Sequence, residues 1–468
     1  MVPPWTDRAT IRRARAAASP ARHGHSAAVP PAVAAGYRIR IKDEHPYPAL
    51  RRPPRRQRVE PSGRLSAARG AHRSPRRHRP CTRKAPHVTA NQPSADPRSP
   101  HPLLDLPPLT AQRFAAIEDR VAGLLRTGND VVITQGEALL PLEACIRGAV
   151  PPGSTALNVV TGPYGETFGG WLRSCGARVV DLTAPFHTAV SAAQVAEALR
   201  EHPEIGFVSL VHAEAATGNT NPVAEIGAVV REHGALLMLD AVASVAAEPL
   251  LTDAWGVDLC VIGGQKAMGG PAGVSAVAVS DRAWEAITAN PQAPRRSYLS
   301  LLDWKERWTD AGRSVLPHAP AQLEMLALEA CLDRIDADGL DAVIARHRAA
   351  AAATRAGVGA LGSLSCYVVR DRDAAPVATT LRAPAGVDAR EVVAAALRSD
   401  PAVPVQAAGG ALAKEMLRVN HYGRAASRTT VLASLAALTA ALTTLDLPTD
   451  PTAATSAAEA AWQSPATD

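Results

Sequence analysis

Short apolar runs rich in β-branched residues alternate with amphipathic stretches along the middle of this chain of 468 residues. The apolar runs have the length of buried strands, and apolar residues in the intervening stretches recur at helical spacing. This alternation predicts βαβ units and a mainly parallel sheet flanked by helices. The expected strands are 130–134, 156–162, 177–182, 206–213 and 235–242, and the expected helices are 137–150, 166–175, 192–202 and 223–233.

The pattern continues with two more strand-like runs, DLCVI at 258–262 and VSAVAVS at 274–280. A long helical pattern follows over 319–361 and is broken near Asp338 and Gly339. Ligands of open α/β sheets bind at the carboxyl ends of the strands. We therefore expect the residues that carry chemistry to lie just after strands.

We expect an α/β protein of two domains with loose ends. The large domain, with an N-terminal lead-in segment, covers 101–340, and a smaller C-terminal α+β domain covers 341–447. Residues 1–100 are rich in Arg and Pro and lack a sustained period of 2 or 3.6, and the tail 448–468 is of low complexity. Such segments bury too little apolar surface to offset their chain entropy, so both are expected to be disordered.

The basic charge of the chain comes from its first 100 residues. They hold 22 Lys and Arg against 5 Asp and Glu, whereas the remainder holds 28 against 39. A basic arm for nucleic acid or an acidic membrane is one interpretation. We favour an unstructured leader, or upstream sequence read from a misplaced start with Val88 as the alternative initiation point, and expect no nucleic-acid or membrane partner.

The six cysteines are scattered without metal-ligand spacing, and no stretch approaches 18 uninterrupted apolar residues. This argues against a disulfide framework, a metal site and a membrane span, and it fits a reducing compartment. We expect a soluble cytoplasmic enzyme.

Lys266 stands out because the chain uses lysine so rarely. The sequence contains 45 Arg and 5 Lys, and only 3 Lys follow residue 100. Lys266 lies among glycines in VIGGQKAMGGPAG, directly after a strand-like run. A lysine can lose its proton in a desolvated site and form a Schiff base, which a guanidinium practically cannot. A surface lysine in a loop is the alternative.

Asp240 ends the apolar run GALLMLD, 26 residues before Lys266. A carboxylate at the end of a buried strand can simply cap the next turn. In a pyridine-dependent enzyme it is also the expected partner that keeps the ring nitrogen protonated, which makes the ring an electron sink. The pair on consecutive parallel strands favours the second interpretation.

The runs HAEAATGNTNPVAEIGAVVREHGALLMLDAVAS and WGVDLCVIGGQKAMGGPAG resemble class V aminotransferases of the alanine–glyoxylate type. The similarity extends from Arg126 to Gly423. It implies fold type I with a seven-stranded type of sheet, a homodimer or homotetramer, and a small-molecule amino donor and keto acid. It also implies Lys266 as the Schiff-base lysine, Asp240 as the partner of the pyridine nitrogen, and Tyr164 as the aromatic that stacks on the ring.

Gly136 and Glu137 stand where this family typically holds a cofactor phosphate with a small Gly/Ser/Thr-rich loop at a helix N-terminus. A helix end suits a dianion, but a carboxylate about 4 Å from it repels it by roughly 4 kcal/mol per charge pair at an effective dielectric of about 20. Glu137 is either a solvent-facing residue of the first helical turn or the acceptor for a hydroxymethyl group that replaces the phosphate.

The second interpretation resembles the branch of the family that transfers an amino group between pyridoxamine and pyruvate, with pyridoxal or pyridoxamine as bound substrate. Arg418 in EMLRVNHYG matches the arginine that binds the substrate α-carboxylate. A second arginine of this branch is replaced by Gly409 or Gly410, and Ala215 and Ala216 stand where hydroxyl residues are frequent. The alternatives are an alanine–glyoxylate or serine-type enzyme that uses pyridoxal 5'-phosphate, and a non-catalytic regulator with this fold.

Overall fold

The computed structural model describes residues 38–41 and 101–464. Residues 1–37 and 42–100 lie outside the described part of the chain, so the expected disorder of these residues stays a prediction. The same expectation is wrong for β1 (Arg38–Ile41), which pairs antiparallel with β4 (Arg178–Thr183). Alternating β-branched residues favour a strand, and the edge of a sheet offers unpaired backbone groups to it.

The larger part of the described chain alternates strands and helices, and the elements expected over 130–280 are confirmed with ends that shift by a few residues. In chain order it contains α2 (Ala111–Leu124), β2 (Asp130–Gln135), α3 (Leu139–Ala149), β3 (Thr155–Val160), α4 (Pro163–Ser174), β4, α5 (Ala192–Glu201), β5 (Ile205–Val211), β6 (Ala213–Glu214), β7 (Asn219–Thr220), α6 (Val223–His233), β8 (Leu236–Asp240), β9 (Leu259–Gly263), β10 (Val274–Val279), α7 (Asp281–Ala289), α8 (Leu301–Trp304), the π-helix η1 (Lys305–Thr309) and α9 (Gln322–Asp338).

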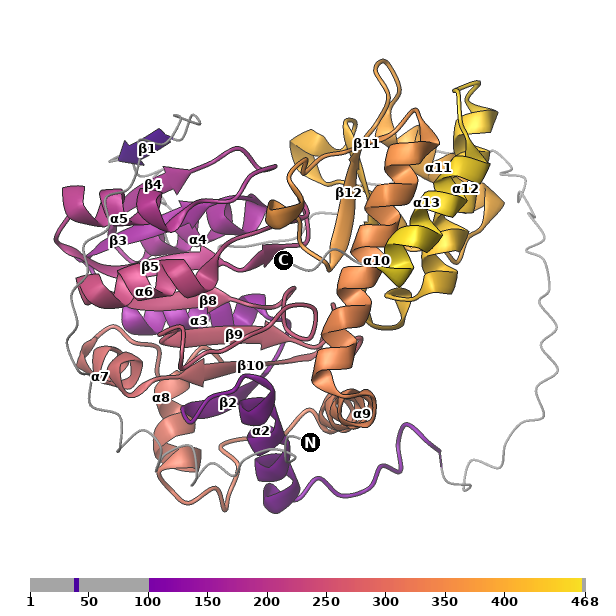
Figure 1. Ribbon diagram of the computed structural model, residues 1–468. Helices are drawn as coiled ribbons and strands as arrows, with labels where there is room; N and C mark the ends of the chain where they lie inside the picture. Colours follow the sequence, from indigo (N-terminus) through magenta and orange to yellow (C-terminus); the bar gives the residue numbers. More distant parts are fainter. Residues whose placement is uncertain (1–37, 42–100, 465–468) are drawn as a thin grey trace, which may run out of the picture. The chain divides into compact units, whose positions relative to one another are not determined.

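The main sheet has the strand order β1-β4-β3-β5-β8-β9-β10-β2. Strands β4, β3, β5, β8 and β9 run parallel, whereas β10 is antiparallel to both of its neighbours. The expected mainly parallel sheet is thus confirmed. Helix α6 crosses in front of the sheet and α3 lies behind it in Figure 1, which explains why β3, β8, β9 and β10 are buried throughout.

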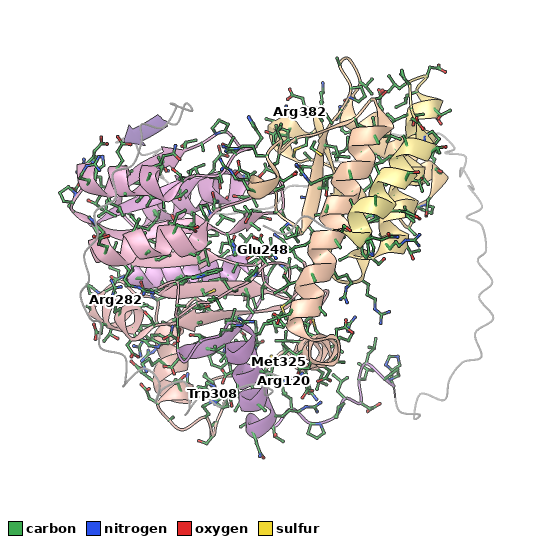
Figure 2. The ribbon with its side chains drawn as sticks, viewed as in Figure 1. Arg120, Glu248, Arg282, Trp308, Met325 and Arg382 are labelled. Carbon is green, nitrogen blue, oxygen red and sulfur yellow. The ribbon has the colours of Figure 1, made fainter. Side chains whose placement is uncertain are left out.

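Aromatic packing joins α2 to the segment that follows α7. The Phe114 ring stacks on Trp304 at a centroid distance of 5.8 Å and meets Trp308 edge-on at 5.4 Å. Trp308, labelled in Figure 2, is fully buried and donates its indole N–H to Glu118 Oε2 at 2.9 Å. Buried Trp is most stable when this N–H has a partner.

The long helical pattern is confirmed as two helices, α9 and α10 (Leu340–Leu361), separated at Gly339. A second sheet of order β11-β12-β14-β13 follows, in which each described pair is antiparallel. The elements after α10 are, in chain order, β11 (Ser365–Cys366), η2 (Asp371–Asp373), β12 (Ala378–Arg382), α11 (Ala389–Ser399), β13 (Val405–Ala407), η3 (Gly410–Leu412), β14 (Met416–Asn420), η4 (Gly423–Ala425), α12 (Arg428–Thr444) and α13 (Pro451–Gln463).

The described residues form two main hydrophobic clusters. One extends from Phe114 to Val343 and the other from Ala350 to Ala458. We keep a domain boundary near residue 340 as a proposal. Within residues 38–41 and 101–464, no helix combines the length and apolarity needed to cross a bilayer.

The tail is helical where the sequence pattern predicted disorder, so that prediction is wrong for 451–463; residues 465–468 lie outside the described part. Asp450 caps α13 by accepting from the Ala453 amide at 2.9 Å, and Ala454 and Ala458 are buried. Alanine is the strongest helix former, and its small side chain lets α13 approach α10 closely. The alanine-rich, low-complexity sequence of the tail therefore suits a helix that packs closely on its neighbour.

Gly357 on α10 makes this packing testable. A Cβ at Gly357 would lie 2.5 Å from Leu435 Cδ1 and 3.2 Å from the Ala454 carbonyl oxygen, whereas a Cβ at exposed Gly359 meets nothing within 4 Å. Gly357→Val should therefore lower the free energy of unfolding by about 1–3 kcal/mol relative to Gly359→Val. Thermal or denaturant unfolding of the two variants measures the difference, and equal stabilities would contradict the packing.

Candidate active site

Three residues predicted from the sequence lie at or just after the carboxyl ends of parallel strands. Asp240 is the last residue of β8, Lys266 lies between β9 and β10, and Tyr164 is in the first turn of α4 after β3. The Nζ atom of Lys266 lies 5.0 Å from the centroid of the Tyr164 ring. The carboxyl ends of the parallel strands thus bring an amine and an aromatic face together.

The Lys266 loop is held by its own backbone and by a distant loop. The Gly270 amide donates to the Gly264 carbonyl at 2.7 Å, and the Gly423 amide donates to the Ala267 carbonyl at 3.2 Å. Gly269 has a φ of +68°, and a Cβ there would lie 2.9 Å from the Gly423 Cα. Close backbone approach therefore requires glycine beside Lys266.

Asp240 is buried, and its Oδ1 accepts from the Val242 amide at 3.0 Å. Burial raises the pKa of Asp240 to about 6, and the nearby negative charge of Glu137 acts in the same direction. The Lys266 ammonium and the Val242 amide lower this pKa. Asp240 therefore carries its negative charge at neutral pH, with Lys266 as the opposing charge.

Contacts between loops fix the position of Asp240. The His212 amide donates to the Asp240 carbonyl at 2.9 Å, and His212 Nε2 lies 3.5 Å from Glu248 Oε2. Thr220 donates its hydroxyl to the same oxygen of Glu248 at 3.0 Å; Figure 2 labels Glu248. The loops after β5 and β8 therefore form one hydrogen-bonded unit.

The Tyr164 phenol lies within the field of several carboxylates. Burial raises its pKa to about 12, and the charges of Asp240, Glu137 and Glu214 add to this effect. Tyr164 therefore keeps its proton at neutral pH. Glu137, predicted from the sequence, is close enough for its charge to raise the pKa of both Asp240 and Tyr164.

Glu137 occupies the N-terminal end of α3. Its Oε2 accepts from the Leu139 amide at 2.9 Å, and its Oε1 accepts from Gln265 Nε2 at 2.6 Å. Gly136 before it has a φ of +155°, where a side chain would be strained. Glu137 is exposed, as the first interpretation expects, and its carboxylate takes the positive helix end that would otherwise suit a phosphate.

Arg418 lies on β14 and reaches the loop after β5. It donates to the Ala215 carbonyl at 3.1 Å and to Gln406 Oε1 at 3.1 Å, and its buried Nε has no partner within the described chain. A Cβ at Gly409 or Gly410 would meet nothing within 4 Å. Within the described residues no hydrogen bond or ion pair joins Arg418 to Lys266, but Arg418 donates to the carbonyl of Ala215, the residue next to Glu214.

Two residues of this site were missed by the sequence argument. Glu214 is fully buried and interacts electrostatically with both Tyr164 and Asp240. Tyr422 follows Arg418 by four positions, and burial raises its pKa. The signal for Glu214 was the His-x-Glu-x-x-Thr-Gly block itself, in which a glutamate stands between two alanines directly after a buried strand.

The chain and its fold have counterparts among known proteins. Residues 108–440 match the family described as aminotransferase class-V. This chain is a class V aminotransferase.

Relatives of this aminotransferase agree with the assignment. It is 35% identical to pyridoxamine–pyruvate transaminase of Mesorhizobium japonicum over 73% of this chain and 86% of that protein. It is 28% identical to alanine–glyoxylate aminotransferase of Drosophila melanogaster over 68% and 81%. The crystal structure of pyridoxamine–pyruvate aminotransferase from Mesorhizobium loti is 33% identical, with a TM-score of 0.71 over 76% and 90%. These comparisons confirm the expected fold type I and the expected transaminase family.

Proposed function

We propose that this aminotransferase transfers an amino group from pyridoxamine to pyruvate and, in reverse, from L-alanine to pyridoxal. The observation that carries the proposal is the Glu137 carboxylate on the Leu139 amide at the start of α3. The relative from Mesorhizobium japonicum named for this reaction supports it.

The residues fit the pyridine ring of a B6 vitamer but not its phosphate ester. Lys266 offers an amine beside the face of Tyr164, and Asp240 offers a buried carboxylate for a protonated ring nitrogen. At the phosphate position, Glu137 brings a negative charge that is already bonded to a helix-end amide. We propose that Glu137 accepts a hydrogen bond from the hydroxymethyl group of the free vitamer.

The ring, when bound, supplies an electron sink for a carbanion at the reacting carbon. Lys266 attaches to the aldehyde and, when released, moves the proton between the amino-acid α-carbon and C4′, the carbon outside the ring that carries the amino nitrogen of pyridoxamine. Asp240 keeps the ring nitrogen protonated, and Tyr164 stacks on the ring. Arg418 binds the carboxylate of the keto acid, because a guanidinium fork matches its geometry.

We also propose a homodimer or homotetramer in the cytoplasm. The described surface exposes large apolar side chains, which a partner subunit is expected to cover. They include Leu139 at the start of α3, Tyr298, Val315 and Leu323 at the start of α9.

Turnover of pyridoxamine with pyruvate by extensively dialysed enzyme tests the function. We expect full activity without added pyridoxal 5'-phosphate, because the vitamer is a substrate that leaves after each cycle. Phosphate-bearing cofactor that survives dialysis, together with glyoxylate turnover, would instead support the alanine–glyoxylate or serine-type alternative. Absence of all transamination, with binding to nucleic acid that depends on residues 1–87, would support the regulator.

A further inference from the structure

Glu214 is a buried acid that the proposed reaction does not use. Its side chain is fully shielded from solvent, and its carboxylate oxygens face the backbone amides of Tyr164 and Gly165 without reaching full hydrogen-bond geometry with either. An ionised carboxylate with such incomplete hydrogen bonding is costly in buried surroundings, which favours the protonated form. The geometry alone therefore describes an unusual glutamate beside the reaction site.

Glu214 packs against the start of the helix that carries Tyr164. Gly162 is the N-cap of α4 and provides no capping side chain. A Cβ at Gly162 would lie 2.3 Å from Glu214 Cδ. Only glycine leaves room for this carboxyl group, so Gly162 and Glu214 form a matched pair at the helix end.

The charged groups that act on Glu214 come from three packed elements. Burial raises its pKa to about 8, and the negative charge of Asp240 on β8 raises it further. The Lys266 ammonium and the helix-end amides of Tyr164 and Gly165 oppose this shift. The Tyr164 phenol is a further titratable neighbour, and Arg418 from β14 donates to the carbonyl of the adjacent Ala215.

We propose that Glu214 is a positioning residue that works as a neutral acid: it holds the first turn of α4, and hence Tyr164, and leaves Asp240 as the one ionised carboxylate of the pair. A like charge nearby disfavours a second ionisation in a buried site, so the carboxyl with the higher pKa stays protonated. Above pH 8 the second charge forms beside Asp240, and the site loses its single-charge state. The consequence for catalysis rests on the proposed role of Asp240, whereas the protonation state of Glu214 does not.

The first test uses the protein without any ligand. The folded pKa of Glu214 lies above its ordinary value of 4.5, so its contribution to stability is fully present below about pH 4.5 and is lost as pH rises through 8. Glu214→Gln mimics the neutral acid and removes this titration. Its Tm relative to the natural protein should therefore rise by roughly 2–5 °C between pH 6 and pH 9.

Glu248→Gln is the matched control, because Glu248 is also largely buried but accepts a hydrogen bond from Thr220. Its Tm difference should stay constant over the same range. A constant difference for Glu214→Gln would overturn the proposal. If that variant does not fold, infrared titration of the natural protein decides: a protonated carboxyl band that disappears near pH 8 is expected, and its absence at pH 7 overturns the proposal.

The second test uses the active enzyme. The alkaline limb of the pH profile of kcat/KM should move upward by at least one pH unit in Glu214→Gln, and an unchanged limb would contradict the effect on Asp240. A merely structural role would lower activity equally at every pH. If no transamination occurs at all, the proposed function fails, while the ligand-free measurement still decides the protonation of Glu214.

Discussion

Replacing Lys266 with alanine should lower the rate of transamination by about 10⁴-fold or more, because one side chain both attaches to the aldehyde and transfers the proton. Lys266→Arg should be equally inactive, since a guanidinium keeps the charge but is a poor nucleophile and proton carrier. Lys414→Ala, which removes an exposed lysine, should leave the rate unchanged.

The measurements are steady-state rates and the visible absorbance that develops when pyridoxal is added. The natural enzyme should acquire a lysine-bound chromophore, and both Lys266 variants should lack it. The 5.0 Å separation between Nζ and the Tyr164 ring centroid positions this lysine at the face of the expected ring site. A Lys266→Ala variant that retained full turnover would refute the assignment.

Replacing Glu137 with serine should reverse the preference between free vitamer and phosphate ester. Loss of one hydrogen bond to a charged group weakens pyridoxal binding by about 10- to 100-fold. Removal of the charge relieves a repulsion of roughly 4 kcal/mol per unit charge, worth about 10³-fold in affinity for the phosphate ester. The ratio of the two affinities should therefore change by about 10⁴- to 10⁵-fold.

Titration of both ligands against the purified variants measures this ratio. Glu137→Gln should give an intermediate value, because the amide oxygen still accepts a hydrogen bond without the charge. Glu143→Ser is the control on the same helix, since Glu143 pairs with Arg147 at 2.6 Å and takes no part in the helix-end contact. An unchanged ratio in Glu137→Ser would contradict the proposed role of Glu137.

Much of the fold follows from periodicity in the sequence. Runs such as DVVIT and ALLMLD have continuous apolar centres, VVI and ALLML, and both become buried strands, β2 and β8. The break at Gly339 was equally visible, because glycine ends one helix where another begins. Periodicity gave the wrong prediction for the tail, because an alanine-rich stretch has no apolar stripe. Its burial depends on how closely it can approach α10.

The candidate site was partly visible as well. Lys266 and Asp240 were predicted because each follows a strand, and parallel strands bring their carboxyl ends to one edge. Glu137 was recognised as an anomaly, but its partner Gln265 lies 128 positions away and no local pattern joins them. Glu214 lies in the motif HAEAATG, yet its burial and its incomplete hydrogen bonding depend on the surrounding chain.

The sequence alone thus determined the order of strands and helices, the positions of Lys266 and Asp240, and the membership of a family, because these depend on local periodicity and on short motifs. Tertiary structure decided the match of Glu214 with Gly162, the contact of Gly269 with Gly423 and the helical tail. Each of these depends on burial and charge among residues far apart in the chain. Such proximity exists only after the chain has closed the loops between them.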